Sequence, residues 1–236
     1  MFFLFAAIGA ALMTLSHVAP FPFLLDLVAP APSRWEIPSD EDTPRVYLTF
    51  DDGPNPTATP ALLDVLAQED AVATFFLIDR HLDAETAPIV TRMFDEGHAV
   101  ALHSHTRILM TLPPSEFAKR LQTAAARIEQ LTGHRPCRVF RPHGGWRSGQ
   151  MYEGLALIDH TLVGWGWFLW DWDWFRSPNP DRLVQRFAGR VSGGDIIVMH
   201  DGHHEDGQAD RRYTVEATGR LIPVLREQGF AFGTVC

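Results

Sequence analysis

Residues 45–54 of the chain read RVYLTFDDGP and predict a strand that ends in two carboxylates. The first six residues are mostly β-branched, aromatic or aliphatic, and the Gly53-Pro54 pair that follows ends the strand. In α/β barrels, the reacting groups lie where strands end and loops begin. Asp51 and Asp52 are adjacent at such an end, so a cation or a proton must separate their roles, with one acting as a ligand and the other as a base.

Short apolar runs alternate with amphipathic helical patterns along the rest of the chain. The predicted strands are residues 45–50, 73–78, 98–103, 138–141, 161–167, 195–200 and 230–235. The predicted helices are residues 59–68, 84–96, 115–131, 149–157, 180–191 and 214–228. Alternating strands and helices predict an α/β architecture with a parallel, barrel-like sheet.

Polar residues stand at or just past the ends of different predicted strands. They are Asp51 and Asp52, His103, Arg141, Asp173 and His200. Because the carboxyl ends of parallel strands meet at one face, we expect these side chains to share a single pocket.

The stretch that ends in Asp51-Asp52-Gly53-Pro54 resembles the first motif of the polysaccharide deacetylases, the NodB homology family (carbohydrate esterase family 4). The resemblance runs over residues 45–236 and implies a distorted (β/α)7 TIM-like barrel. It also implies that Asp51 is the catalytic base and that Asp52 binds a divalent metal, usually zinc.

Residues 103–107, His-Ser-His-Thr-Arg, resemble the second motif of the family, in which a second metal-binding histidine follows the first by four residues. Here Arg107 occupies that position and cannot bind a cation. Asp52 and His103 alone leave a zinc site one protein ligand short. His105 is one candidate for the third ligand. Alternatively, the Arg107 guanidinium takes the place of the metal and supplies its positive charge.

Residues 140–146, Phe-Arg-Pro-His-Gly-Gly-Trp, resemble the third motif of the family, and residues 195–201, Asp-Ile-Ile-Val-Met-His-Asp, resemble the fifth. The resemblance implies that Arg141 orients the catalytic base, and that the backbone amide near Gly144 donates a hydrogen bond to the oxyanion of the reaction. It implies that His200 is the general acid and that Val198 shapes the pocket for the acetyl methyl group. His203 and His204 follow in a Gly/Asp-rich loop, where they are either solvated or close enough to complete a metal site.

Residues 165–174 hold five of the seven tryptophans of the chain. Part of this segment is expected to form the floor of a sugar-binding groove, because sugar rings stack on indole faces and a core does not need so many indoles. The resemblance implies that an Asp-Trp pair here contacts the motif-three arginine and lines the cleft. Asp173 and Trp174 match this pair by position, with Asp171 and Trp172 as the alternative.

Three regions are expected: an apolar N-terminal segment (residues 1–29), a linker (30–44) and the deacetylase-like domain (45–236). Residues 1–25 contain no Lys, Arg, Asp or Glu and favour a membrane anchor with the domain outside the cytoplasm; a cleaved signal segment of a secreted or periplasmic protein is the rival. A net charge of −9 without a basic block argues against nucleic acid as a partner. A single disulfide between Cys137 and Cys236 is left open.

These observations predict a hydrolase of carbon–nitrogen bonds other than peptide bonds, acting on an N-acetylated amino sugar of a glycan. One alternative is a metal-independent amidohydrolase that acts on a small cyclic amide. The other is a catalytically silent, membrane-tethered domain that binds glycans. The presence of both Asp51 and His200 favours an enzyme.

Overall fold

The computed structural model describes residues 4–5, 8–9, 33–40, 42–172 and 177–236. Its strands are β1 (Ser33–Arg34), β2 (Arg45–Asp51), β3 (Thr74–Ile78), β4 (Ala99–His103), β5 (Val139–Arg141), β6 (Thr161–Val163), β7 (Ile196–His200) and β8 (Ala231–Phe232). Its α-helices are α3 (Ala58–Gln68), α4 (Ala87–Asp95), α5 (Pro114–Thr132), α6 (Gly149–Leu157), α7 (Pro180–Ala188) and α8 (Arg212–Glu227). Three 3₁₀ turns complete the fold: η1 (Asp79–His81), η2 (Arg107–Thr111) and η3 (His143–Gly145).

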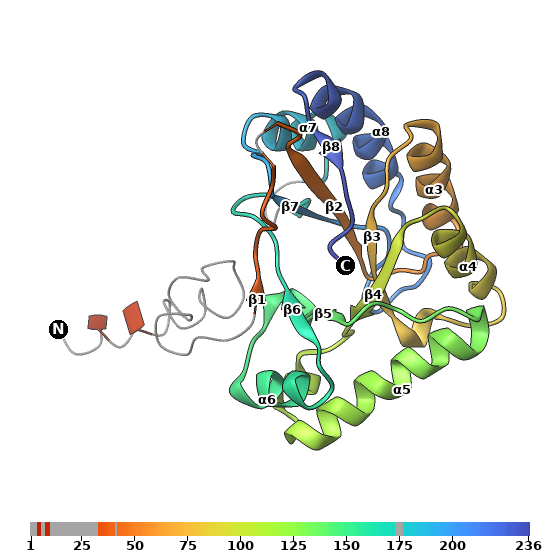
Figure 1. Ribbon diagram of the computed structural model, residues 1–236, viewed down its shortest axis with the longest axis vertical. Coiled ribbons are helices and arrows are strands. Elements are labelled where there is room, and N and C mark those ends of the chain that lie inside the picture. Colours follow the sequence, from red (N-terminus) through yellow and green to blue (C-terminus); the bar gives the residue numbers. More distant parts are fainter. Residues whose placement is uncertain (1–3, 6–7, 10–32, 41, 173–176) are drawn as a thin grey trace.

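The strands form one parallel sheet in the order β1-β6-β5-β4-β3-β2-β7, and β8 pairs with β2 outside this path. The helices lie around the outside of the strands (Figure 1). This arrangement confirms the predicted α/β class with a parallel sheet. Near the two edge strands, Glu36 pairs with Asp195, and the amide of Ile37 donates to the carbonyl of Gly194.

The sheet differs from the sequence prediction at three strands. β1 lies within the segment predicted as a linker, and residues 33–34 are paired with β6. β6 ends at Val163 rather than residue 167, because the chain turns after Gly164, against which the ring of Trp35 packs. β8 covers only two of the six predicted residues. Strands this short carry too little alternation to be located from sequence.

Helix α5 illustrates how the sequence sets the helical layer. It begins after Pro113, with a proline in its first turn, and it ends at Gly133, whose φ of 77° is the left-handed conformation that glycine tolerates. Phe117, Leu121 and Ile128 are buried against the sheet, as their spacing predicts. Leu131, in the last turn of the helix, is 40% exposed.

Two apolar layers hold the sheet in place. The larger layer fills the space between the sheet and the helices, where Phe50 stacks on Phe75 with ring centroids 5.3 Å apart. The smaller layer lies on the inner side of the strands and contains Phe76, Val163 and Val198. Strands buried on both faces explain why the strand sequences are continuously apolar.

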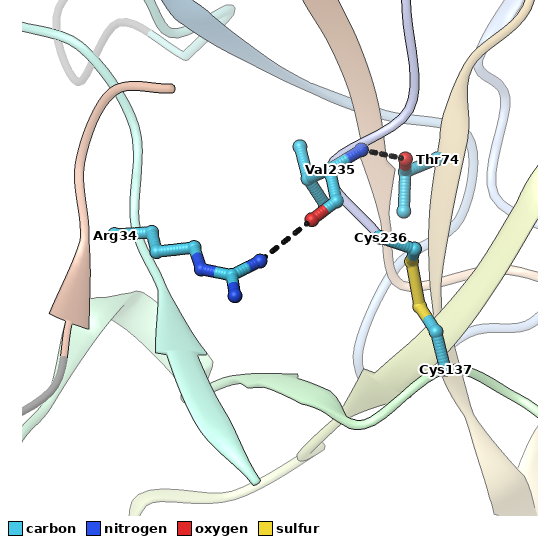
Figure 2. The surroundings of a disulfide bond; sticks show 5 residues. All are labelled: Arg34, Thr74, Cys137, Val235 and Cys236. Carbon is cyan, nitrogen blue, oxygen red and sulfur yellow. Dashed lines mark hydrogen bonds between the residues drawn. A yellow bond between two sulfur atoms is a disulfide. The ribbon is translucent and has the colours of Figure 1, made fainter. Parts of the chain in front are cut away.

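A disulfide joins Cys137, which precedes β5, to Cys236 at the end of the given chain (Figure 2). The adjacent Val235 donates its amide to Thr74 Oγ1 and accepts a hydrogen bond from Arg34. These contacts lie at the amino ends of the strands, opposite the predicted pocket. The disulfide closes a separation of 99 residues, and a loop of that length constrains the unfolded chain strongly.

Most of the predicted N-terminal anchor, residues 1–29, lies outside the described residues. Within the part of the chain that the structure describes, no helix has the length and apolar character needed to cross a membrane.

Candidate active site

The predicted strand ends meet in one pocket of about 460 Å³. Strand register aligns Asp51 with His200 across β2 and β7, and His103 with Arg141 across β4 and β5. The pocket is lined by Asp51, Asp52, His103, His143, Gly144, Trp165, Asp171, Trp172, His200, His203, His204, Arg211 and Tyr213. Its volume lies within the range of small-molecule sites in proteins.

Asp51 is held by a fully buried arginine. Nη1 of Arg141 donates to Asp51 Oδ1 at 2.7 Å and also donates to Thr49 Oγ1 at 2.8 Å. The other guanidinium nitrogens donate to the carbonyls of Val163 and Gly164. Because every guanidinium nitrogen is bonded and the group cannot deprotonate, Arg141 orients the Asp51 carboxylate as the sequence leads us to expect.

Asp52, His103 and His143 place three ligand atoms within 4.8 Å of one another. Asp52 Oδ1 lies 3.3 Å from His103 Nε2 without hydrogen-bond geometry. Both Asp52 Oδ1 and His103 Nδ1 are buried and have no hydrogen-bond partner among the described residues. One carboxylate and two imidazoles form the donor set of a catalytic zinc or similar divalent cation with an open position. The three side chains therefore fit a metal.

The electrostatics of this trio favour metal binding. Burial would raise the pKa of Asp52, but the neighbouring His103, with His200 and His143, holds it well below its usual range. Burial and the nearby His103 lower the pKa of His143 to about 3. The carboxylate is therefore ionised and the His143 ring is neutral, as metal ligands must be.

His143 is the residue that the sequence analysis missed, and it corrects the prediction for His105. Strand β4 ends at His103, and Ser104 then accepts a hydrogen bond from the His143 amide at 2.9 Å. The chain turns there, so His105 lies half-buried near Arg80 and Asp79, outside the ligand trio. The available signal was a histidine directly after Arg141-Pro142, at the carboxyl end of the strand beside β4.

Arg107 is exposed and lies across Gly144 rather than between Asp52 and His103. A Cβ at residue 144 would lie 3.2 Å from Arg107 Nη2. Gly144 has a φ of 60°, a left-handed conformation that favours glycine. The backbone of Gly144 lines the pocket, where its amide can serve as the predicted oxyanion donor.

On the opposite side of the pocket, His200 pairs with Asp171. His200 Nδ1 lies 2.7 Å from Asp171 Oδ1, and its backbone amide donates to Asp171 Oδ2 at 2.9 Å. A carboxylate only accepts, so Nδ1 carries the proton of this bond. Burial would lower the pKa of His200, but the charge and hydrogen bond of Asp171, with Asp51 and Asp52, raise it to about 9.

The preferred Asp-Trp pair of the sequence analysis, Asp173 and Trp174, lies outside the described residues. The alternative pair, Asp171 and Trp172, lines the pocket, and Trp172 packs edge-on against His200. Asp171 contacts His200, whereas the resemblance implied a contact with Arg141.

Two further expectations concern the edges of the pocket. Val198 is fully buried in the inner apolar layer with Trp165, and the partly buried Trp172 packs against that layer; Val198 is not among the residues that line the pocket. It therefore supports the pocket wall from behind. His203 and His204 do line the pocket, with the His204 ring 4.5 Å from that of His143.

A buried carboxylate, an opposed histidine and three side chains that fit a metal lie together at the carboxyl ends of parallel strands, an arrangement that suits a hydrolase. Comparisons with known proteins agree. The polysaccharide deacetylase family model matches residues 39–163. The chain belongs to the polysaccharide deacetylase family.

Relatives over most of the chain carry deacetylase names. The peptidoglycan-N-acetylglucosamine deacetylase of Bacillus cereus is 30% identical, covering 85% of this chain and 90% of that protein. A chitooligosaccharide deacetylase of a Bradyrhizobium species is 36% identical, covering 80% of this chain and 87% of that protein. The solved structure of a family 4 acetyl xylan esterase from Clostridium thermocellum, in complex with a cobalt ion, matches with a TM-score of 0.70 at 30% identity, covering 80% of this chain and 87% of that one.

Proposed function

We propose that this protein removes the acetyl group from an N-acetylated amino sugar of a glycan. The observation that carries the proposal is the pairing of Asp51 with His200 at one register position of β2 and β7. Asp51 has the buried partner Arg141, and His200 has the buried partner Asp171. These partners suit Asp51 to act as a base and His200 to act as an acid. The deacetylase names of the relatives support an amide bond of an amino sugar as the target.

The residues divide the work of amide hydrolysis. Asp51, oriented by Arg141, takes a proton from the water that attacks the acetyl carbonyl. The Gly144 amide donates a hydrogen bond to the oxyanion that forms on that carbonyl. His200, kept protonated by Asp171, gives its proton to the leaving nitrogen, so that acetate and a free amine result.

We propose that Asp52, His103 and His143 bind a divalent cation, with zinc as the first candidate. Their donor set and orphaned buried atoms support this proposal, as does the cobalt ion in the related esterase. When bound, such a cation polarises the carbonyl and acidifies water. His143 thus replaces, from a different strand end, the histidine that Arg107 displaces.

Aromatic rings beside His200 support a glycan as the substrate. Trp172 stacks on Trp170 with centroids 5.3 Å apart, and Trp170 stacks on Phe168 at 5.1 Å. Phe168 is 38% exposed, so the row leads from the acid to the surface. Such a row can carry sugar units that extend beyond the pocket.

We further propose that the enzyme works outside the cytoplasm, tethered by its apolar N-terminal segment. The disulfide between Cys137 and Cys236 supports an oxidising compartment. The charge-free run of residues 1–25 supports a membrane anchor.

Acetate release from chito-oligosaccharides and from peptidoglycan fragments tests the proposed reaction. Purified wild-type protein should release acetate from at least one of them. Asp51→Asn and His200→Ala should each slow release about 10²–10⁴-fold, the range of general acid–base groups. A wild-type rate in either variant would show that the substituted residue is not needed for the reaction. If the wild type releases no acetate from any acetylated glycan, the proposed function is wrong.

A further inference from the structure

The first turn of α8 contacts both members of the Asp171–His200 pair at the edge of the pocket. Tyr213 Oη donates a hydrogen bond to Asp171 Oδ2 at 3.2 Å. The next residue, Thr214, donates from Oγ1 to the backbone carbonyl of His200 at 2.9 Å. Two consecutive side chains of one helix therefore contact both partners of the acid pair.

Arg211 fixes the direction of the tyrosine hydrogen bond. Its Nη1 donates to Tyr213 Oη at 2.7 Å, and its Nε donates to the carbonyl of Gly202, in the loop after β7. A guanidinium only donates, so the phenol must accept from Arg211 and send its own proton to Asp171. Burial and the Asp171 charge raise the pKa of Tyr213, so this proton stays in place at any working pH.

We infer that Tyr213, held by Arg211, is a positioning residue that sets the orientation and the charge distribution of the Asp171–His200 pair. Asp171 has two oxygens, and His200 bonds to both of them. The Tyr213 hydroxyl adds a hydrogen bond from α8 to the Oδ2 oxygen of this carboxylate. This inference rests on the proposed function, because it assigns His200 the role of acid.

Removing the hydroxyl should misplace the acid and also make it weaker. The charged and titratable groups that face His200 are Asp171 from the loop before α7, Asp51 at the end of β2 with Asp52 just after it, and Tyr213 from α8. Without the Tyr213 proton, Asp171 concentrates its charge on His200. The imidazolium then holds its proton more tightly and gives it up less readily to the leaving nitrogen.

The test compares Tyr213→Phe with Tyr152→Phe, using the full chain and the best glycan substrate of the wild type. Tyr152 is a matched control, because its hydroxyl is hydrogen-bonded to Ser33 Oγ of β1 at 2.9 Å and the residue is not among those that line the pocket. Tyr213→Phe should lower kcat about tenfold, the size expected for losing a hydrogen bond to a charged group, and should leave KM within about twofold. The alkaline limb of its pH profile should move to higher pH. Tyr152→Phe should match the wild type in all three.

The inference is overturned if Tyr213→Phe keeps the wild-type kcat and alkaline limb, or if it changes KM alone. Arg211→Lys is the second variant: it keeps the charge but cannot make both contacts, and it should shift kcat and the limb in the same direction by less. If Tyr213→Phe fails to fold, Arg211→Lys with an unchanged kcat and limb overturns the inference. An inactive wild type would instead contradict the proposed function.

Discussion

His143 faces His103 across the pocket, with ring centroids 6.2 Å apart, although the two residues come from different strand ends. Asp52 completes the trio from a third strand end, where its φ of 72° is a left-handed conformation rare for a residue other than glycine. Strained backbone of this kind persists where the surroundings demand it, and it is concentrated at functional sites. The surrounding structure therefore holds Asp52 in the position that completes the trio.

The pH dependence of the enzyme should depend on Asp171. His200 has a pKa raised to about 9, above its ordinary value of 6.5, so it stays protonated and active as an acid up to that pH. Asp171→Asn removes the largest raising influence and should move the alkaline limb of kcat/KM to lower pH. A limb unchanged in the Asp171→Asn variant would contradict the pairing.

The same pair links stability to pH. Because the folded pKa of His200 is raised, its stabilising contribution is fully present below about pH 6.5 and is lost as the pH rises through about 9. The free energy of unfolding of the wild type, measured by chemical denaturation, should fall between about pH 7 and about pH 9.5. The fall should be smaller in Asp171→Asn. An equal slope in both proteins would contradict the linkage.

Trp172→Ala should separate glycan binding from chemistry. The indole lines the pocket beside His200, so its loss should raise KM for oligosaccharides roughly 3- to 10-fold. A small activated acetyl ester needs no stacking platform, and its KM should change less. Equal increases for the two substrates would assign Trp172 to folding.

The disulfide should matter for stability and not for chemistry, because it lies at the amino ends of the strands. Cys236→Ser should lower the Tm by roughly 5–15 °C, as expected for losing a bridge that closes a long loop. Wild-type protein under reductant should unfold at the same temperature as the variant. A variant with the oxidised wild-type Tm would show that the bridge contributes nothing.

The sequence predicted those features that a local pattern encodes. The apolar runs before Asp51 and His200 located both residues at strand ends, and the register of β2 and β7 aligns the two. β1 escaped prediction because two residues show no alternation. The Asp-Trp-Asp-Trp run repeats with a period of two residues, so pattern alone cannot distinguish Asp171 from Asp173.

His143 escaped prediction for a different reason. It is far from His103 in the chain, and only the pairing of β4 with β5, which aligns His103 with Arg141, brings the two rings together. The expected position, residue 107, is only four residues after His103 and could be judged from spacing along the chain. Predicting a ligand from a neighbouring strand requires the register between the two strands, and spacing along the chain does not give that register.

Arg107→His offers a rescue that follows from this exchange. We expect His143 to supply the metal ligand that the family motif places at position 107. The double variant Arg107→His/His143→Ala should then bind zinc more tightly than His143→Ala alone. Isothermal titration with zinc measures this directly. No gain in the double variant would contradict the idea that the two positions serve the same metal.

The most direct measurement is the zinc content of the purified chain after dialysis, compared among wild type, His143→Ala and His105→Ala. His105 is the matched control, since it is a nearby histidine outside the trio. Wild type and His105→Ala should each hold about one zinc per chain, and His143→Ala should lose it, with an affinity loss beyond the ~10–100-fold typical of outer-shell partners. Full zinc in His143→Ala, or loss of zinc in His105→Ala alone, would contradict the account.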